Sequence, residues 1–144
     1  MKNIFKILLV EDNEGDAELT IEALQDLAVK SQIEVINDGE QAISYLSNAG
    51  RLKDRKLPDL ILLDLNLPKV DGKEVLLFVK NSEALKKIPV VVLTTSSLES
   101  DIAFAYNNHA NCYMVKSGNL MEFNKAISAL EAFWINSVTY ANIN

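Results

Sequence analysis

The residues of this chain whose types and spacing could do chemistry together lie at the ends of four apolar segments. The segments cover residues 7–10, 60–63, 90–93 and 112–115, and the polar residues that follow them are Glu11, Asp12, Asp64, Thr94 and Lys116. Parallel strands that are buried on both faces have continuous apolar sequences, and open α/β sheets bind ligands at the carboxyl ends of such strands. If the four strands are neighbours, three carboxylates, one hydroxyl and one ammonium group meet at one end of a sheet.

This combination of groups suits a divalent cation and a phosphoryl group. Three neighbouring acids repel one another, and a cation is needed to keep all of them ionised. Hard oxygen ligands of this kind suit Mg²⁺. A lysine and a threonine opposite such a cation would bind the oxygens of a phosphoryl group. The pattern therefore predicts a phosphorylation site that uses magnesium.

The elements that position these residues are expected to be alternating strands and helices. Apolar segments alternate with helical patterns along the chain, which is typical of a βαβ array. A further short strand is expected at residues 33–36. Capping-box spacings predict helix starts at Asp38, Asp71, Ser96 and Asn119. The sequence thus predicts an α/β fold with five strands and five helices, in a single domain over residues 1–144 that leaves no segment for an effector domain.

Composition and charge argue against several classes of protein. The 144 residues are 49% hydrophobic and 24% charged, which is ordinary for a globular domain. The net charge of −6 argues against binding to nucleic acid or to anionic lipid. No apolar segment approaches the length that spans a membrane, and the first residues lack the features of a signal peptide. The single cysteine, Cys112, excludes an internal disulfide and fits a reducing compartment, so the expected location is the cytoplasm.

The last predicted helix has two apolar faces. The first face follows alternating steps of three and four residues and comprises Leu120, Phe123, Ile127, Leu130 and Trp134. A broad stripe that faces the core accounts for this first face. The second face comprises Ala126, Ala129 and Phe133, and the helix is expected to run to about Tyr140. Because exposed apolar patches mark binding surfaces, the second face is predicted to contact a partner, with a homodimer about a twofold axis as the first candidate.

Four motifs together resemble the receiver domain of two-component response regulators. They are LLVEDN at residues 8–13, LLDLNLPKVDG at 62–72, VLTT at 92–95 and YMVK at 113–116, in the order and spacing of that family. The sequences KSGNL at 116–120 and FW at 133–134 further resemble the stand-alone receivers that serve bacterial phytochrome histidine kinases. The resemblance covers nearly the whole chain. It implies the flavodoxin-like receiver fold, a doubly wound five-stranded parallel sheet in the order 2-1-3-4-5.

The resemblance also implies a role for each acid. Asp64 is implied as the phosphoacceptor, which takes a phosphoryl group from a histidine of a partner sensor kinase. The implied ligands of Mg²⁺ are Asp12, Asp64 and the backbone carbonyl of Asn66, with Glu11 acting through a bound water. The implied function is therefore that of a single-domain response regulator in a two-component phosphorelay, which is a signalling domain rather than an enzyme.

Two residues are implied to bind the phosphoryl group and two to transmit its presence. Lys116 and Thr94 would contact phosphoryl oxygens. Thr94 and Tyr113 would couple phosphorylation to the surface formed by the fourth helix, the fifth strand and the fifth helix. Most receivers have a proline in a cis peptide after this lysine, and the residue here is Ser117. A cis bond before serine costs about 3–4 kcal/mol, so a strained cis peptide and a trans peptide are both considered.

Two other functions compete with phosphorylation at Asp64. A phosphotransferase of the haloacid dehalogenase type would have an Asp-x-Asp pair after its first strand, whereas this chain has Glu11-Asp12 there and Asp64-x-Asn66 after the third apolar strand. A degenerate receiver that acts only as a binding scaffold usually lacks one of the acids or the lysine. All of these residues are present here, which favours a working phosphorylation site.

Overall fold

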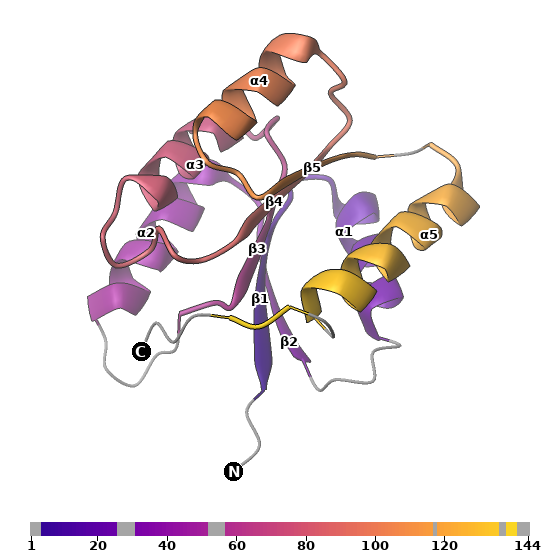
Figure 1. Cartoon of the computed structure of the whole chain (residues 1–144), viewed down its shortest axis with the longest axis horizontal. Helices are drawn as coiled ribbons and strands as arrows, with labels where there is room; N and C mark the ends of the chain where they lie inside the picture. Colours follow the sequence, from indigo (N-terminus) through magenta and orange to yellow (C-terminus); the bar gives the residue numbers. More distant parts are fainter. Residues whose placement is uncertain (1–3, 26–30, 52–56, 117, 136–137, 141–144) are drawn as a thin grey trace.

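Strands and helices alternate along the chain, as Figure 1 shows for the computed structural model, which describes residues 4–25, 31–51, 57–116, 118–135 and 138–140. The strands are β1 Phe5–Val10, β2 Ser31–Ile36, β3 Leu60–Leu63, β4 Val90–Thr94 and β5 Cys112–Val115. The helices are α1 Glu14–Gln25, α2 Gly39–Arg51, α3 Gly72–Lys80, α4 Glu99–Asn107 and α5 Leu120–Leu130, and a π-helical segment, Glu131–Ile135, follows α5 directly. The alternation of strands and helices expected from the sequence is confirmed.

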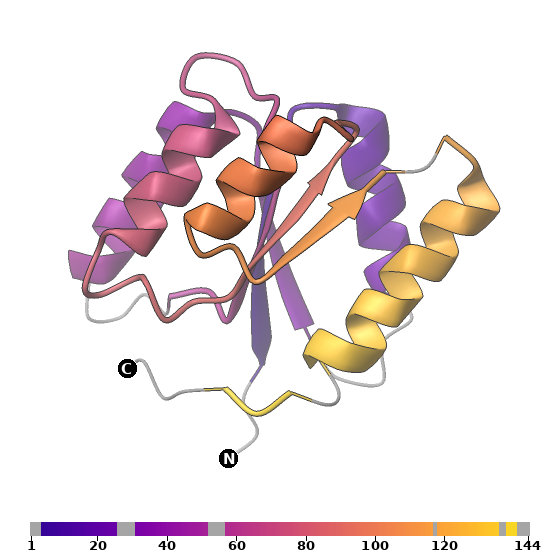
Figure 2. The same ribbon diagram turned by 45° about the horizontal axis from the view of Figure 1, so that its top comes forward.

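The five strands form one parallel sheet in the order β2-β1-β3-β4-β5. Helices α1 and α5 cover one face of the sheet, and α2, α3 and α4 cover the other (Figure 2). The register pairs Val10 with Leu63, and Leu63 in turn with Val92. Thr94 pairs with Val115, so the carboxyl ends of β1, β3, β4 and β5 lie side by side. The predicted doubly wound, flavodoxin-like architecture is therefore confirmed.

The apolar segments are continuous because both faces of the central strands are buried. Along β1, Leu8 and Val10 pack into the core on the side of α2, α3 and α4. Ile7 and Leu9 alternate with them and pack into the core on the side of α1 and α5. Strands β2 and β5 lie at the edges of the sheet and are only partly buried, which explains why their sequences are less uniformly apolar.

Three of the four predicted helix caps are present. The side chain of the capping residue accepts a backbone N–H bond three residues on at Asp38, Asp71 and Asn119. The prediction at Ser96 is wrong, because α4 begins later and Leu98 is its N-cap. The Ser96 hydroxyl instead donates to Asp101 at 2.5 Å and accepts the Leu98 N–H at 3.3 Å. It therefore orders the β4–α4 loop rather than capping a helix.

The C-terminal helix is shorter than predicted. Helical structure ends at Ile135, and residues 138–140 are not helical, so the expected extension to Tyr140 is wrong. The physical reason lies in contacts that turn the chain back to the sheet. The Tyr140 hydroxyl donates to the carbonyl oxygen of Trp134 and so satisfies an acceptor at the helix end. The Tyr140 ring also packs edge-on against Phe5 at the start of β1, with ring centres 5.5 Å apart.

None of the described helices is both long enough and apolar enough to span a membrane.

Candidate functional site

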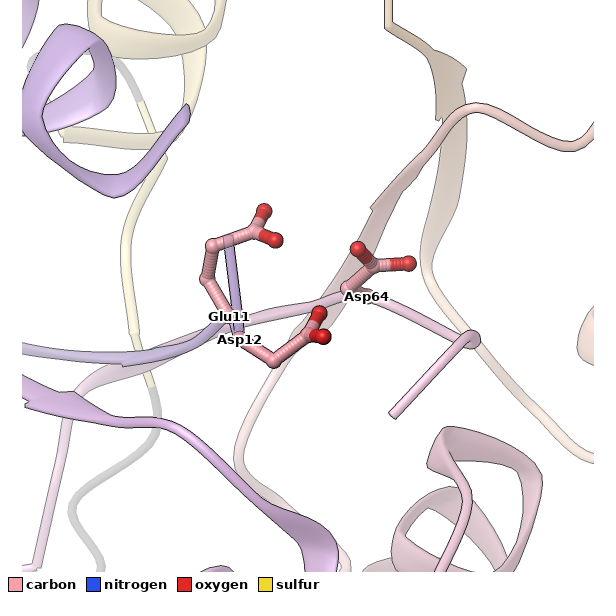
Figure 3. A group of neighbouring side chains, drawn as sticks. All are labelled: Glu11, Asp12 and Asp64. Atoms are coloured by element: carbon pink, nitrogen blue, oxygen red, sulfur yellow. The ribbon is translucent and has the colours of Figure 1, made fainter. Parts of the chain in front are cut away.

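Three carboxylates meet at the carboxyl ends of β1 and β3. Glu11 and Asp12 follow β1 directly, Asp64 follows β3, and their oxygen atoms lie within 4.8 Å of one another. Figure 3 shows the three side chains gathered around one space between these strand ends. Glu11 and Asp64 are buried, and Asp12 is exposed. The convergence of these acids, which the apolar segments predicted, is therefore present in the structure.

Backbone hydrogen bonds fix the positions of the two buried acids. The Glu11 N–H donates to the Ile36 carbonyl at 2.9 Å, and the Asp64 N–H donates to the Val10 carbonyl at 3.0 Å. These bonds continue the parallel hydrogen-bond ladders one residue past the strands. The backbone of both acids is therefore held in place by the sheet. The Asn66 N–H then donates to Asp64 Oδ1 at 3.0 Å and orients that carboxylate.

Helix α3 packs directly against the backbone that carries Asp64. The Gly72 N–H donates to the Leu65 carbonyl at 2.9 Å. A Cβ atom at Gly72 would lie 2.2 Å from the Asp64 carbonyl oxygen and 2.5 Å from the Leu65 Cα, which is far inside contact distance. Glycine is therefore required here by the close approach of two backbone segments.

Lys116 brings a positive charge into the acid cluster from the end of β5. Its backbone N–H donates to the Thr94 carbonyl at 2.7 Å. Its ammonium nitrogen lies 2.6 Å from Glu11 Oε1, 2.9 Å from Asp16 Oδ2 and 3.0 Å from Asp64 Oδ2. The Lys116 side chain is only 5% exposed, so these ion pairs are shielded from water. The peptide that joins Lys116 to Ser117, which the sequence allows to be cis or trans, lies outside the described residues.

Burial and ion pairing shift the pKa values at this site. Burial raises the pKa of Glu11 to about 7, although its hydrogen bond with Lys116 acts in the opposite direction. Burial by itself lowers the pKa of Lys116, but the hydrogen bonds with Glu11 and Asp16 and the charge of Asp64 outweigh it, so the pKa of Lys116 is raised. The lysine therefore remains charged, whereas burial disfavours the ionised form of Glu11.

Asp16 is a member of the site that the sequence analysis missed. It lies in the first turn of α1, where its N–H donates to the Asn13 side chain at 2.9 Å. The sequence offers one signal for it, because Asn13 is a typical N-cap residue and places Asp16 in the first helical turn, close to the acids that precede the helix. No pattern in the sequence predicts its contact with Lys116, which lies one hundred residues later in the chain.

Thr94 is buried at the end of β4, and its hydroxyl oxygen has no hydrogen-bond partner among the described residues. Buried hydroxyls are normally paired, so an unpaired one beside a ligand site suits a ligand that brings an acceptor oxygen. Two residues further on, the Ser96 carbonyl accepts a hydrogen bond of 2.9 Å from the Tyr113 hydroxyl. Tyr113, the second predicted switch residue, therefore contacts the β4–α4 loop two residues after Thr94.

The acids open onto a hollow of about 580 Å³. Its lining consists of Asp12, Asn13, Glu14, Asp16, Asp64, Asn66, Thr95 and Lys116. The donor set of Glu11, Asp12 and Asp64 is made of hard oxygens and fits a divalent cation such as Mg²⁺. Asn66, the predicted backbone ligand, lines the same hollow.

Comparison with known proteins decides the family. A model of the response regulator receiver domain matches residues 7–128. This chain belongs to the response regulator receiver family. Receiver domains are signalling domains, and the predicted response-regulator function is confirmed at this level.

Two relatives match this receiver domain over most of their own length. Response regulator Rcp1 from Synechocystis is 45% identical over 133 residues, which cover 92% of this chain and 90% of Rcp1. The probable methanogenesis regulatory protein FilR2 from Methanothrix harundinacea is 44% identical over 134 residues, which cover 91% of this chain and 84% of FilR2.

Solved structures agree with the fold, and one of them contains a metal ion. The crystal structure of the phosphorylated cyanobacterial phytochrome response regulator RcpA superimposes with a TM-score of 0.92 at 45% identity, covering 97% of this chain and 100% of RcpA. The Mn²⁺-bound form of Rcp1 gives a TM-score of 0.90 at 44% identity, covering 95% and 99% of the two chains. Receiver domains thus bind a divalent metal ion, and the acid cluster of this chain is suited to one.

Proposed function

We propose that this receiver domain accepts a phosphoryl group on Asp64 from a phosphohistidine of a sensor kinase. The observation that carries this proposal is the placement of the Asp64 carboxylate. It lies within 4.8 Å of the acid pair after β1, 3.0 Å from the Lys116 ammonium, and in the lining of an open hollow. A carboxylate in this setting is a nucleophile whose product, an aspartyl phosphate, has counter-charges around it.

In the proposed reaction, a carboxylate oxygen of Asp64 forms a bond to phosphorus while the bond from phosphorus to the kinase histidine nitrogen breaks. The bonding electrons return to the imidazole ring, so no proton has to be moved at Asp64. Lys116 is held beside the reacting carboxylate and would bind one phosphoryl oxygen. The unpaired Thr94 hydroxyl would donate to another. Most of the catalysis is then positioning and charge stabilisation.

Magnesium is the divalent ion that we propose for the site. Asp12, Asp64 and the backbone carbonyl of Asn66 would hold it, with Glu11 acting through water. When bound, it supplies positive charge that lowers the cost of bringing a phosphoryl group to an acidic site.

A direct test is mass spectrometry after incubation with acetyl phosphate, with and without Mg²⁺. We expect one phosphoryl group per chain, located on the peptide that contains Asp64, and only when Mg²⁺ is present. A degenerate receiver, which acts as a scaffold alone, would bind its kinase and gain no mass in either condition.

The switch that we propose runs from Thr94 to the α4–β5–α5 surface. A phosphoryl oxygen would give the Thr94 hydroxyl the partner it lacks and draw the end of β4 towards the site. Ser96 would move with it, and Ser96 is bonded to Tyr113 on β5 and to Asp101 on α4. Asp101 in turn forms an ion pair of 2.8 Å with Lys73 on α3. These contacts link the phosphorylation site to three surface elements.

Replacing Thr94 by alanine tests this switch. We expect Thr94→Ala to accept phosphate and to lose the shifts of amide signals that phosphorylation causes in α4 and β5. Ser97→Ala, which removes an exposed hydroxyl from the same loop, is the control and should respond like the wild type. If the amide shifts of phosphorylated Thr94→Ala match those of the wild type, the coupling through Thr94 is wrong.

We propose a homodimer as the output, formed through the second apolar face, which comprises Ala126 and Ala129 on α5 and Phe133 in the π-helical segment that follows. Phe133 is 57% exposed, and its ring packs edge-on against Trp134 with centres 5.3 Å apart. Ala129 is exposed and Ala126 half-buried, so these residues form a shallow apolar surface. Two copies of one such patch can pair about a twofold axis.

Phe133→Glu tests the dimer, because it places a charge on this patch. We expect the mass measured by light scattering to shift towards monomer while phosphate uptake is retained. Met121→Glu, an equally apolar and even more exposed position at the other end of α5, is the matched control. A wild-type protein that is monomeric at high concentration, phosphorylated and unphosphorylated alike, would rule out the dimer.

The partner that we propose is a sensor histidine kinase of the phytochrome type. The support is the similarity to RcpA, which is described as a phytochrome response regulator, although FilR2 is described as a methanogenesis regulator at nearly the same identity. We also propose a cytoplasmic location, which the single Cys112 supports. Phosphotransfer from a purified phytochrome kinase, compared with a kinase of another sensor class, would test the partner.

A further inference from the structure

Lys116 is held by an acid, Asp16, that lies on α1 rather than at the end of a strand. Its Oδ2 atom is 2.9 Å from the Lys116 ammonium nitrogen, beside the contacts of 2.6 Å to Glu11 and 3.0 Å to Asp64. An ammonium group has three N–H donors, so these three carboxylates use all of them. A phosphoryl oxygen that binds Lys116 must therefore displace one of these three carboxylates from its N–H donor.

The local structure of α1 leaves the Asp16 carboxylate free for this contact. Asp16 is the third residue of the helix, where an acid commonly accepts the backbone N–H of the N-cap residue. Here the N–H of Asn13 donates to Glu11 Oε2 at 3.2 Å instead. The backbone of Asp16 is fixed on both sides, because its N–H donates to Asn13 and its carbonyl accepts the Thr20 hydroxyl at 2.8 Å.

Asp16 differs from the other two partners of Lys116 in what else it could bind. Within the described residues, the acids close enough to share a cation are Glu11, Asp12 and Asp64. A metal ion would therefore compete with Lys116 for Glu11 and Asp64, and a phosphoryl group would modify Asp64. Asp16 lies outside that cluster, so its bond to Lys116 can persist through both events.

A second hollow beside the site could accept the Lys116 side chain if its ion pair with Asp16 were lost. This hollow has a volume of about 240 Å³ and is lined by Asp16 and Lys116 together with Leu19, Leu120 and Phe123. Asp16 and Lys116 also line the hollow over the acids, so the ion pair stands between the two spaces. A lysine side chain is long and flexible, and it would gain access to this neighbouring space if the pair were broken.

We propose that Asp16 is a positioning residue, which holds the Lys116 ammonium beside Asp64 while the other acids of the site bind the metal ion and the phosphoryl group. This inference rests on the proposed phosphorylation of Asp64. Asp16 itself touches neither the reacting carboxylate nor the phosphoryl group in this role. It acts through Lys116 alone.

The test measures the rate of phosphoryl uptake from acetyl phosphate at saturating Mg²⁺. Asp16→Asn keeps the shape of the side chain and removes its charge. We expect uptake to slow roughly tenfold, because a misplacement on the order of 1 Å near the reacting atoms can cost up to about a hundredfold. Asp16→Glu restores the charge and should recover most of the rate. Glu18→Gln removes an exposed charge from the same helix, away from the lining of the hollow, and should change the rate less than twofold.

A spectroscopic measurement separates positioning from a loss of stability. With Mg²⁺ and beryllofluoride, a phosphoryl mimic, the ammonium ¹⁵N signal of Lys116 should be observable because its protons are buried and hydrogen-bonded. Asp16→Asn should broaden this signal through faster proton exchange, and Asp16→Glu should recover it. Unchanged amide spectra elsewhere would show that the fold is intact.

The possible outcomes are distinguishable. A wild-type protein that takes up no phosphoryl group would overturn the proposed function and this inference with it. Uptake by the wild type together with an unchanged or faster rate in Asp16→Asn would overturn the inference alone. Equal slowing by Asp16→Asn and Glu18→Gln would also overturn it, because the effect would then be one of charge and not of position.

Discussion

Asp64→Asn is expected to abolish phosphoryl uptake while leaving the protein folded. An amide is not a nucleophile that can form an acyl phosphate, so the loss should be complete rather than partial. The fold should persist because asparagine can still accept the Asn66 N–H that now binds Asp64 Oδ1.

Mass spectrometry after incubation with acetyl phosphate and Mg²⁺ measures this loss. The matched control is Asp71→Asn, which makes the same chemical change at the N-cap of α3. Asparagine caps helices about as well as aspartate, so this control should fold and take up phosphate normally. Phosphate uptake by Asp64→Asn at the wild-type rate would mean that another residue is the acceptor.

Gly72→Ala is expected to destabilise the fold strongly. Its new methyl group would lie 2.2 Å from the Asp64 carbonyl oxygen and 2.5 Å from the Leu65 Cα, and both are backbone atoms that cannot rotate away. Helix α3 must therefore shift from the loop that carries Asp64. Forcing a side chain into a tightly packed site costs about 1–3 kcal/mol, and the free energy of unfolding should fall by an amount at the upper end of this range, because both clashes are with backbone.

Urea unfolding of Gly72→Ala and Gly118→Ala provides the comparison. Gly118 is exposed and a Cβ atom there meets no atom within 4 Å, so its substitution should change the free energy of unfolding by no more than about 0.5 kcal/mol. Similar unfolding midpoints for the two variants would show that α3 can move away from the Asp64 loop without cost.

The parts of the site that could be predicted from sequence are those carried by strand ends. The segments before Glu11 and Asp64 are buried on both faces, so their apolar character identifies strands without further information. Parallel strands bring their carboxyl ends together, and the acids follow from that rule. The strand order does not follow from apolar patterning, and here it came from the resemblance to receiver domains.

Other features depend on contacts between distant residues, which local patterns do not encode. Asp16 and Lys116 are one hundred residues apart, and only the packing of α1 beside the end of β5 brings them together. The end of the last helix depends on the Tyr140 hydroxyl reaching the Trp134 carbonyl and on the Tyr140 ring reaching Phe5. Ser96 had the spacing of a cap, but its hydroxyl is bound to Asp101 instead.

The contact between Phe5 and Tyr140 makes this fold suited to circular permutation, because it brings the first strand close to the last described residue. The two rings lie 5.5 Å apart at the amino end of β1, whereas Glu11 and its neighbours lie past the carboxyl end of the same strand. A short linker that joins the chain at Tyr140 to the chain at Phe5 can therefore give a circular permutant, with new ends opened in a surface loop away from the acids. A fluorescent protein attached beyond Tyr140 would likewise sit at the end of the sheet opposite to the hollow, where it leaves the approach of a kinase to Asp64 unobstructed.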